Sequence, residues 1–326
     1  MRAVVYERYG PPEVLHLTEV STPIPAAHEV LIQVRATTVS SGDWRVRSLE
    51  VPAGFGLIIR LVFGFSRPKQ PILGSELAGV VEAVGSDVSR FRPGDPLVAF
   101  SDSAMGCHAE YICLPEDGQL ARKPSNLNFH EAAALCFGGT TALAVLRQAK
   151  VQPGERVLIN GASGSVGTAT VQLACHLGAD VIGVCSSANQ DLVHSLGASQ
   201  VIDYQQTDFS QCGDTYDVII DTAGTAPFAR SRRCLRPGGR LVLLQAGLGA
   251  MLLSPWQTVS SNMTVIAGPL NVKAGDVRQL AELAEAGIYR PVIDRHYPLE
   301  QIVAAHRYVD SGRKTGNVVI TMDPEG

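Results

Sequence analysis

Residues 157–167 read VLINGASGSVG, and this segment is the most informative about the fold. Three aliphatic residues run into a turn of Gly, Ala and Ser. Ala162, Gly164 and Gly167 follow the spacing A-x-G-x-x-G between an expected strand and a helix expected over 166–178. In a dinucleotide-binding turn, the second small residue lets the backbone approach a pyrophosphate, and the third lets the helix pack on its strand. Free N–H groups at the helix start can bind phosphate, although a tight turn without a ligand is the alternative.

The residues around this turn alternate between strand and helix patterns. Strands are expected at 157–160, 180–185, 200–203, 216–222, 240–244 and 263–267, with helices at 189–196, near 226–235 and at 274–286. Such alternation predicts a doubly wound parallel sheet covered on both faces. Residues 1–120 are β-rich, and 299–309 and 316–321 form a last helix and strand. We therefore predict a dinucleotide domain over 125–289, with 1–124 plus 290–326 forming a discontinuous second domain.

Composition excludes several classes of protein. The 326 residues carry a formal charge of −4, which gives no reason to expect binding to nucleic acid or to an anionic membrane. Seven scattered cysteines are typical of free thiols in a reducing compartment, so we expect a cytoplasmic protein. The N-terminus has no apolar signal-peptide region. The apolar segment 56–65 is interrupted by Arg60 and is too short to span a membrane.

The end of the second strand of the alternating region favours NADPH over NADH. An NAD site usually has an acidic residue there, which binds the ribose 2′-hydroxyl. Here Cys185 holds that place, and Ser186, Ser187 and Asn189 follow. These side chains can donate hydrogen bonds to a 2′-phosphate. Tyr204, at the end of the third strand, could cover the adenosine. A polar loop in which Ser187 caps the next helix is the alternative.

Several segments, in order along the chain, resemble a known family. They are PILGSELAGVV at 71–81, VG at 84–85, FRPGD at 91–95, AEY at 109–111, EAAAL at 131–135, GTTA at 139–142, DTAG at 221–224 and PGG at 237–239. With the glycine turn, they make the chain similar to the medium-chain dehydrogenase/reductase superfamily, of the zinc-free quinone oxidoreductase type. The resemblance covers roughly residues 1–322. It implies a Rossmann-type sheet inserted in a β-rich GroES-like domain, and a homodimer.

The chain departs from the zinc-dependent members at both metal-ligand motifs. Residues 39–43 read VSSGD and residues 74–76 read GSE, so that Ser40 and Ser75 replace a Cys and a His. The four cysteines of the structural zinc lobe are also missing, and the adjacent Cys107 and His108 cannot build a tetrahedral site alone. We therefore expect no metal. Without zinc, hydride transfer suits an acceptor that delocalises charge, such as a quinone or an α,β-unsaturated carbonyl.

The expected site residues follow from strand ends and from the resemblance. The candidates for a catalytic role are Asp43, Arg47 and Tyr111. Each of them could instead be structural. The proton could also come from water. Segment 57–65 could cover the substrate cleft, pack on the core or contact another subunit. An NADPH-binding protein with little catalysis, an enoyl-thioester reductase and a zinc alcohol dehydrogenase are the alternatives. The expected cofactor residues are Ser163, Gly164, Ser165, Val166, Ser186, Ser187, Asn189, Tyr204, Thr225, Gln245, Ala246, Gly247, Gly268, Pro269, Leu270, Thr141 and Asn317.

Overall fold

The computed structural model describes residues 1–322, which divide into two compact units. Unit 1 contains residues 1–51, 56–137 and the chain from 274 onward. Unit 2 contains residues 52–55 and 138–273. These limits place 125–137 and 274–289 with unit 1, whereas the sequence assigned them to the dinucleotide domain. The predicted domain boundaries stay a prediction, and residues 323–326 of the second domain lie outside the described chain.

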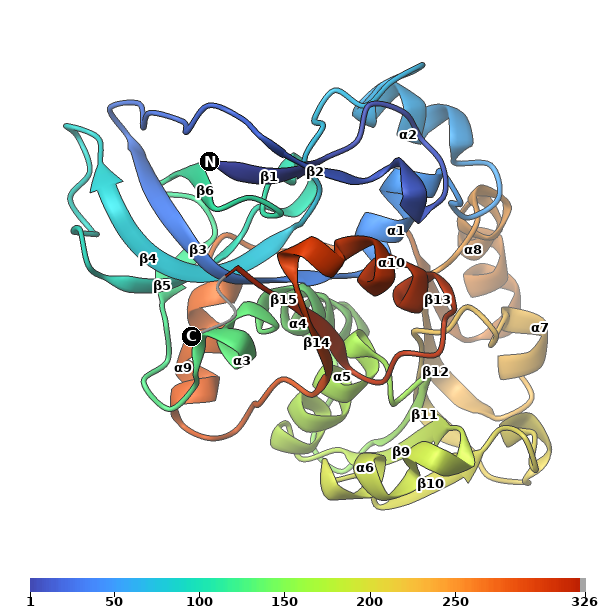
Figure 1. Ribbon diagram of the computed structural model, residues 1–326. Helices are drawn as coiled ribbons and strands as arrows, with labels where there is room; N and C mark the ends of the chain where they lie inside the picture. The colour runs from blue at the N-terminus through green and yellow to red at the C-terminus, as the bar shows by residue number, and fades with distance from the viewer. Residues whose placement is uncertain (323–326) are drawn as a thin grey trace. The chain divides into compact units, whose positions relative to one another are not determined.

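Unit 2 is built on a parallel sheet of six strands in the order β10-β9-β8-β11-β12-β13 (Figure 1). Every neighbouring pair in it is parallel. The strands are apolar and largely buried, as expected for a sheet covered on both faces. The strands are β8 (Arg156–Asn160), β9 (Asp180–Cys185), β10 (Gln200–Asp203), β11 (Tyr216–Asp221), β12 (Leu235–Leu243) and β13 (Thr264–Ala267). The helices are α4 (Cys136–Ala149), which begins in unit 1, α5 (Ser165–His176), α6 (Gln190–Ser195), α7 (Phe228–Ser231) and α8 (Leu248–Ser261), with short 3-10 turns η3 (Ser187–Asn189) and η4 (Phe209–Gln211).

Unit 1 is built on a mostly antiparallel sheet in the order β14-β15-β3-β4-β5-β7, with β6 also paired to β3. The last strand of the described residues, β15, pairs with β3, so segments from early and late in the chain form one sheet. Strands β1 and β2 pair with each other in a separate two-stranded sheet. The strands are β1 (Arg2–Val5), β2 (His16–Glu19), β3 (Glu29–Val39), β4 (Glu76–Val84), β5 (Pro96–Phe100), β6 (Tyr111–Pro115), β7 (Leu120–Arg122), β14 (Ile293–Pro298) and β15 (Asn317–Thr321). The helices are α1 (Ser41–Ser48), α2 (Gly56–Phe63), α3 (Phe129–Ala133), α9 (Asp276–Glu285) and α10 (Ile302–Asp310), with 3-10 turns η1 (Pro12–Val14), η2 (Asp102–Ala104) and η5 (Leu299–Gln301).

The predicted fold class is confirmed, since a GroES-like β-rich part and a Rossmann-like parallel sheet are both present. Each unit has its own hydrophobic core. In unit 1 residues such as Ile32, Leu77 and Leu97 pack together, and in unit 2 Leu158 and Ile219 do so. The helix expected near 226–235 is shorter, because the chain already enters β12 at Leu235. No helix within residues 1–322 is long and apolar enough to cross a bilayer.

Candidate dinucleotide site

The parallel sheet of unit 2 gathers most of the predicted cofactor residues along one edge. Residues 161–166 follow β8, residues 186–189 follow β9, and Tyr204 follows β10. Thr225, residues 245–247 and residues 268–270 follow β11, β12 and β13. Since all six strands are parallel, their carboxyl ends lie at the same edge. Strand β8 lies between β9 and β11, where the strand order reverses, and open α/β sheets bind ligands at such a point.

The turn after β8 has room for an added side-chain carbon at Gly164 but not at Gly167. A Cβ built at Gly164 would have only Gly161 O near it, at 3.7 Å. A Cβ at Gly167 would lie 2.1 Å from the same oxygen. Packing of α5 on the turn therefore requires a glycine at 167, whereas nothing in the protein requires one at 164. The small residue at 164 fits the close approach of a phosphate to the α5 N-terminus.

A polar cluster joins this turn to the loop after β9. Asn189 donates from Nδ2 to Ser163 Oγ at 3.2 Å and to Ser186 Oγ at 3.3 Å. Ser187 does not cap a helix, as the alternative interpretation required; its hydroxyl donates to Gln205 Oε1 at 3.2 Å. Burial raises the pKa of Cys185 to about 11, with Asp203 adding to the effect, so this thiol stays neutral. The sheet edge next to β9 is thus lined by hydroxyl and amide groups.

Asp203, the acidic residue that ends β10, is hydrogen-bonded to neighbouring residues of the protein. Asp203 is buried and accepts hydrogen bonds from Gln205 N and Gln206 Nε2, both at 2.9 Å. Its carboxylate therefore holds the turn after β10. Tyr204, by contrast, is 57% exposed, and its ring is accessible to an adenosine.

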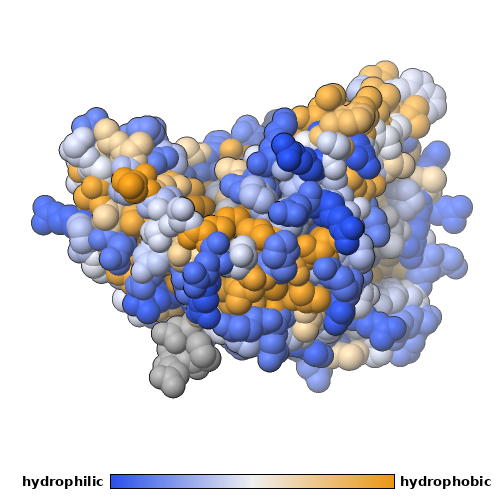
Figure 2. All heavy atoms as spheres, turned by 45° about the horizontal axis from the view of Figure 1, so that its top comes forward, coloured by the Kyte–Doolittle hydropathy of each residue, from blue (hydrophilic) through white to orange (hydrophobic). Residues whose placement is uncertain are grey.

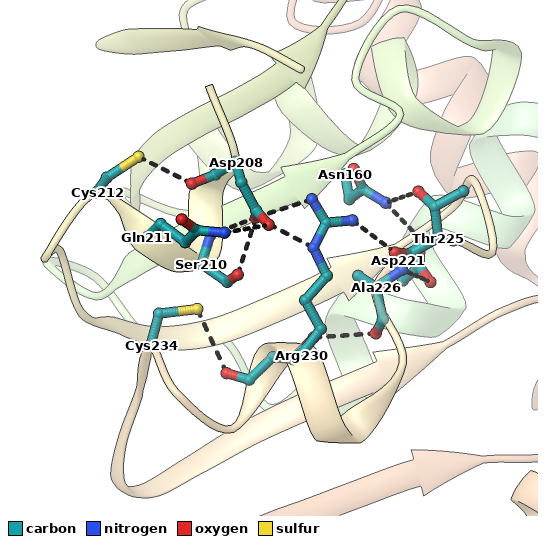
Figure 3. Close-up of polar contacts among 11 residues, drawn as sticks. Asn160, Asp208, Ser210, Gln211, Cys212, Asp221, Thr225, Ala226, Arg230 and Cys234 are labelled. Atoms are coloured by element: carbon teal, nitrogen blue, oxygen red, sulfur yellow. Dashed lines mark hydrogen bonds and ion pairs between the residues drawn. The ribbon is translucent and has the colours of Figure 1, made fainter. Parts of the chain in front are cut away.

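The loop after β11 is held by two buried residues that the sequence did not single out as site residues. Asp221 accepts hydrogen bonds from Gly224 N and Ala226 N at 2.9 Å each, and from Asn160 Nδ2 at 2.8 Å. Asn160 also donates to Thr225 Oγ1 at 2.8 Å. Figure 3 shows Asn160 and Asp221 converging on this loop. Their position at the ends of the two central strands was the signal that could have found them.

Arg230 fixes the same loop from its other side. Its guanidinium bonds Asp208 at 2.8 Å and donates to Thr225 O at 2.8 Å (Figure 3). Burial acts to raise the pKa of Asp208, but hydrogen bonds from Ser210 and Arg230 outweigh it and lower the pKa to about 2. Beside the loop, residues 245–247 and Asp221 line a cavity of about 190 Å³. The positioned loop and the cavity thus lie at the same edge of the sheet as the turn after β8.

The catalytic candidates of unit 1 make hydrogen bonds or ion pairs with other residues of the protein. Ser40 caps α1 and donates to Asp43 Oδ2 at 2.6 Å, while Asp43 Oδ1 accepts from Gly74 N at 2.8 Å. Arg47 is fully buried and bonds Asp310 at 2.5 Å and Gly10 O at 2.6 Å. Tyr111 OH accepts from Gln33 Nε2 at 3.3 Å. These contacts give Asp43 and Arg47 clear structural roles.

The two serines at the zinc-ligand positions are both buried, and they differ in their partners. Ser40 is saturated by the α1 cap, whereas Ser75 Oγ has no hydrogen-bond partner among the described atoms. Cys107 is buried next to Ser101, and burial raises the pKa of its thiol to about 12. Over residues 1–322, no three His, Cys, Asp or Glu side chains come together as a metal-binding group.

Of the two remaining predicted residues, Thr141 lies on α4 in unit 2, half-buried. Asn317 is buried in unit 1, at the start of β15, and its Nδ2 donates to Val292 O at 3.0 Å. The sheet edge described above does not include either of them.

Comparison with known proteins assigns the family. Residues 26–125 match the alcohol dehydrogenase GroES-like domain, and residues 196–320 match a family described as zinc-binding dehydrogenase. The quinone oxidoreductase of Mus musculus is 33% identical over 99% of this chain and 98% of its own length. This chain belongs to the medium-chain dehydrogenase/reductase superfamily, in its quinone oxidoreductase-like group. It is therefore an oxidoreductase.

Solved structures of this superfamily agree with the fold. A quinone oxidoreductase from Coxiella burnetii has a TM-score of 0.87 at 28% identity, over 99% of both chains. The quinone oxidoreductase of Escherichia coli, solved in complex with NADPH, has a TM-score of 0.83 at 26% identity, over 98% of this chain and 100% of that one.

Proposed function

We propose that this medium-chain oxidoreductase binds NADPH and transfers hydride to a quinone or an α,β-unsaturated carbonyl without zinc. The observation that carries the proposal is the edge of the parallel sheet. There the turn is open at Gly164, and hydroxyl and amide groups stand where an NAD site has a carboxylate. The predicted cofactor residues keep their proposed roles, with Ser163, Gly164, Ser165 and Val166 at the phosphates.

The ribose end supports the phosphorylated nucleotide. A 2′-phosphate is an anion and needs donors. Ser186 and Asn189 offer a hydroxyl and an amide close together. Asp203, at the end of the neighbouring strand β10, is hydrogen-bonded within its own turn. In the related Escherichia coli enzyme the bound nucleotide is NADPH. We infer the same preference here.

The reaction type follows from what this chain can offer a developing negative charge. Bound NADPH would supply the hydride. Ser40 and Ser75 stand at the two positions where zinc enzymes have metal ligands. The hydroxyl of Ser40 is already hydrogen-bonded in the α1 cap. A quinone or enone spreads the charge over several atoms, so that a few preorganised N–H or O–H donors, each worth about 3–4 kcal/mol, are enough. We assign Asp43 and Arg47 to positioning and take water as the proton source.

The experiment that tests this proposal is a substrate panel with both nucleotides. Purified protein is assayed with 9,10-phenanthrenequinone, 2-alkenals, cyclic enones and an enoyl thioester, using NADPH and NADH in parallel, while metal content is measured by mass spectrometry. We expect quinone or enone reduction, a preference for NADPH and no stoichiometric zinc. NADPH binding without turnover would instead support a binding protein, a preference for the thioester would support an enoyl reductase, and bound zinc with ketone reduction would support an alcohol dehydrogenase.

A single substitution tests where the 2′-phosphate lies. Ser186→Asp places a carboxylate beside the proposed phosphate, and repulsion between like charges should lower the NADPH-over-NADH preference at least about tenfold, or roughly 1.4 kcal/mol. Ser186→Asn, which keeps a donor, is the matched control. An unchanged preference in the Asp variant would place the phosphate elsewhere.

We also propose that the protein is a homodimer, through the β13 side of unit 2. Strand β13 is an edge strand, and α8, which packs on it, exposes Leu252, Leu253, Trp256 and Val259. Residues 241–272 contain no Asp, Glu, Lys or Arg. An uncharged apolar helix beside an open strand edge is suited to self-association. Light scattering should give the mass of a dimer, and Trp256→Glu should give a monomer.

A further inference from the structure

The segment formed by α2 and the turn after it shows an apolar side to solvent. Its outward side chains are all exposed, at 62% for Leu57, 62% for Leu61 and 64% for Phe65. Figure 2 shows hydrophobic atoms at the surface in the upper right, the side on which Figure 1 labels α2. We call this set of residues the α2 surface, and it consists of Leu57, Ile58, Leu61, Val62 and Phe65.

The α2 surface is held in place from below. Phe63, on the inner side of the helix, packs against the core of unit 1. Tyr9 OH donates to Gly64 O at 2.8 Å. Gly64 has a φ of +126°, and a Cβ there would lie 2.0 Å from Arg67 O, so only glycine permits this tight turn. The apolar side chains therefore point outward from an anchored segment and are not the exposed flank of a loose loop.

Basic side chains are folded back next to the apolar ones. Lys69 donates from Nζ to Leu61 O at 2.8 Å, and Arg60 donates to Phe65 O at 2.7 Å. Arg67 is exposed in the turn between them. Residues 51–75 contain three basic residues and no Asp or Glu, although the whole chain carries a charge of −4. Positive charge is thus concentrated at the apolar segment.

We propose that the α2 surface is a peripheral binding site for an anionic lipid membrane. Apolar side chains that enter the acyl boundary, with Arg and Lys at the level of the phosphates, are the arrangement by which short segments lie on a bilayer. The charge of the segment complements an anionic headgroup layer, which a neutral protein partner would not require. The segment is too short to span the bilayer, so binding is reversible and depends on ionic strength. This inference does not depend on the proposed NADPH chemistry.

The test is co-sedimentation of the full-length protein with extruded vesicles. Two compositions are compared, pure phosphatidylcholine and a mixture with about one-third phosphatidylserine. We expect at least roughly tenfold tighter binding to the anionic vesicles, and a loss of this difference at high salt. Failure to bind either composition, or equal binding to both, would overturn the proposal.

Two variant pairs separate the apolar and the basic contributions. Leu61→Ser/Phe65→Ser should weaken binding at least about 50-fold, because two inserted side chains are lost. Arg67→Gln/Lys69→Gln should weaken binding to anionic vesicles roughly 25-fold, at about fivefold per charge, and leave binding to neutral vesicles unchanged. Ile24→Ser and Arg92→Gln/Arg313→Gln change exposed residues outside the segment and serve as matched controls.

The oligomeric state of the same variants tests the competing occupant. If a second copy of the chain covers the α2 surface, Leu61→Ser/Phe65→Ser reduces the molecular mass in solution, and vesicle binding does not respond to the substitution. That result would also overturn the proposal. Thermal unfolding of every variant checks that the fold is retained.

Discussion

The glycine turn of unit 2 and the polar cluster at the start of α1 in unit 1 are both made of small and polar residues, yet they are completed differently. Around α1, Ser40, Asp43 and Arg47 find their partners inside the protein, from the Gly74 N–H to the Asp310 carboxylate. In the turn, Gly164 leaves space that no protein atom fills.

We infer that this difference separates structural positions from the proposed ligand-binding positions. A buried polar group that is already saturated has no capacity left for a ligand, and its loss is felt as instability. A small residue that packing does not require indicates a group outside the protein. The comparison predicts that substitutions in unit 1 change the free energy of unfolding, whereas an additional methyl group at Gly164 changes binding.

The largest effect is expected from Arg47→Met. The substitution removes a fully buried guanidinium and leaves the half-buried Asp310 carboxylate and Gly10 O without their donor, which should lower the free energy of unfolding by about 3 kcal/mol. Urea unfolding at neutral pH measures it. Arg307→Met, on the same helix as Asp310, removes an exposed pair with Glu13 and should leave the free energy of unfolding nearly unchanged. A stable Arg47→Met protein without turnover would contradict the structural role, because Arg47 would then act on the substrate.

The next effect concerns Glu76, which is fully buried on β4. Burial raises its pKa to about 7, against hydrogen bonds from Thr38 and from the N–H groups of Cys136 and Phe137. The fold therefore favours the protonated acid. The contribution of Glu76 to the free energy of unfolding is fully present below about pH 4.5 and is lost as the pH rises through about 7. The loss is up to about 3 kcal/mol.

Glu76→Gln removes this titration. The stability of the variant relative to wild type should increase between about pH 5 and pH 8, as measured by urea unfolding at both values. Glu82→Gln, on the exposed part of the same strand, is the matched control. A constant difference between variant and wild type across this range would mean that Glu76 does not titrate there.

The sequence predicted the elements in which the pattern of hydrophobic residues follows directly from burial. The strands of unit 2, such as β8 and β9, are continuous apolar runs, and the glycine turn marks the start of α5. Helix α8 was not predicted, because it contains Pro255 and is apolar on its exposed side, so it lacks the usual polar face. Strand β14 was missed as well, since charged and polar residues interrupt its pattern.

The same limit applies to the candidate site. Strand ends could be located from the sequence, so the positions of Ser186 and Gln245 at the sheet edge were predictable. The partners of Asp43 and Arg47 were not, because Gly74 and Asp310 are brought to them by tertiary folding across long chain separations. The positioning roles of Asn160 and Asp221 depend on β8 and β11 being neighbours, which local patterns do not reveal.

A matched pair of glycine substitutions tests the comparison within the turn itself. Gly167→Ala forces a Cβ to within 2.1 Å of Gly161 O and should lower the free energy of unfolding by about 1–3 kcal/mol. Gly164→Ala should change it by less than about 0.5 kcal/mol, yet raise the NADPH dissociation constant about 10–100-fold. Urea unfolding and fluorescence titration give the two quantities. Unchanged NADPH affinity in Gly164→Ala would show that the space at this position is not used by the phosphates.

The smallest change in the free energy of unfolding is expected from Arg230→Met. Arg230 is informative because it contributes to stability and also positions the loop after β11. The substitution removes the half-exposed pair with Asp208 and the bond to Thr225 O, and should cost about 1 kcal/mol near neutral pH. Since the pKa of Asp208 is lowered to about 2, this contribution is present above about pH 4 and fades as the pH falls towards 2. Because the loop after β11 loosens, NADPH affinity should fall about threefold. Arg233→Met, at an exposed position, should change neither the free energy of unfolding nor the NADPH affinity. Lower stability with unchanged NADPH affinity would restrict Arg230 to the structural side of the comparison and leave Asn160 and Asp221 to hold the loop.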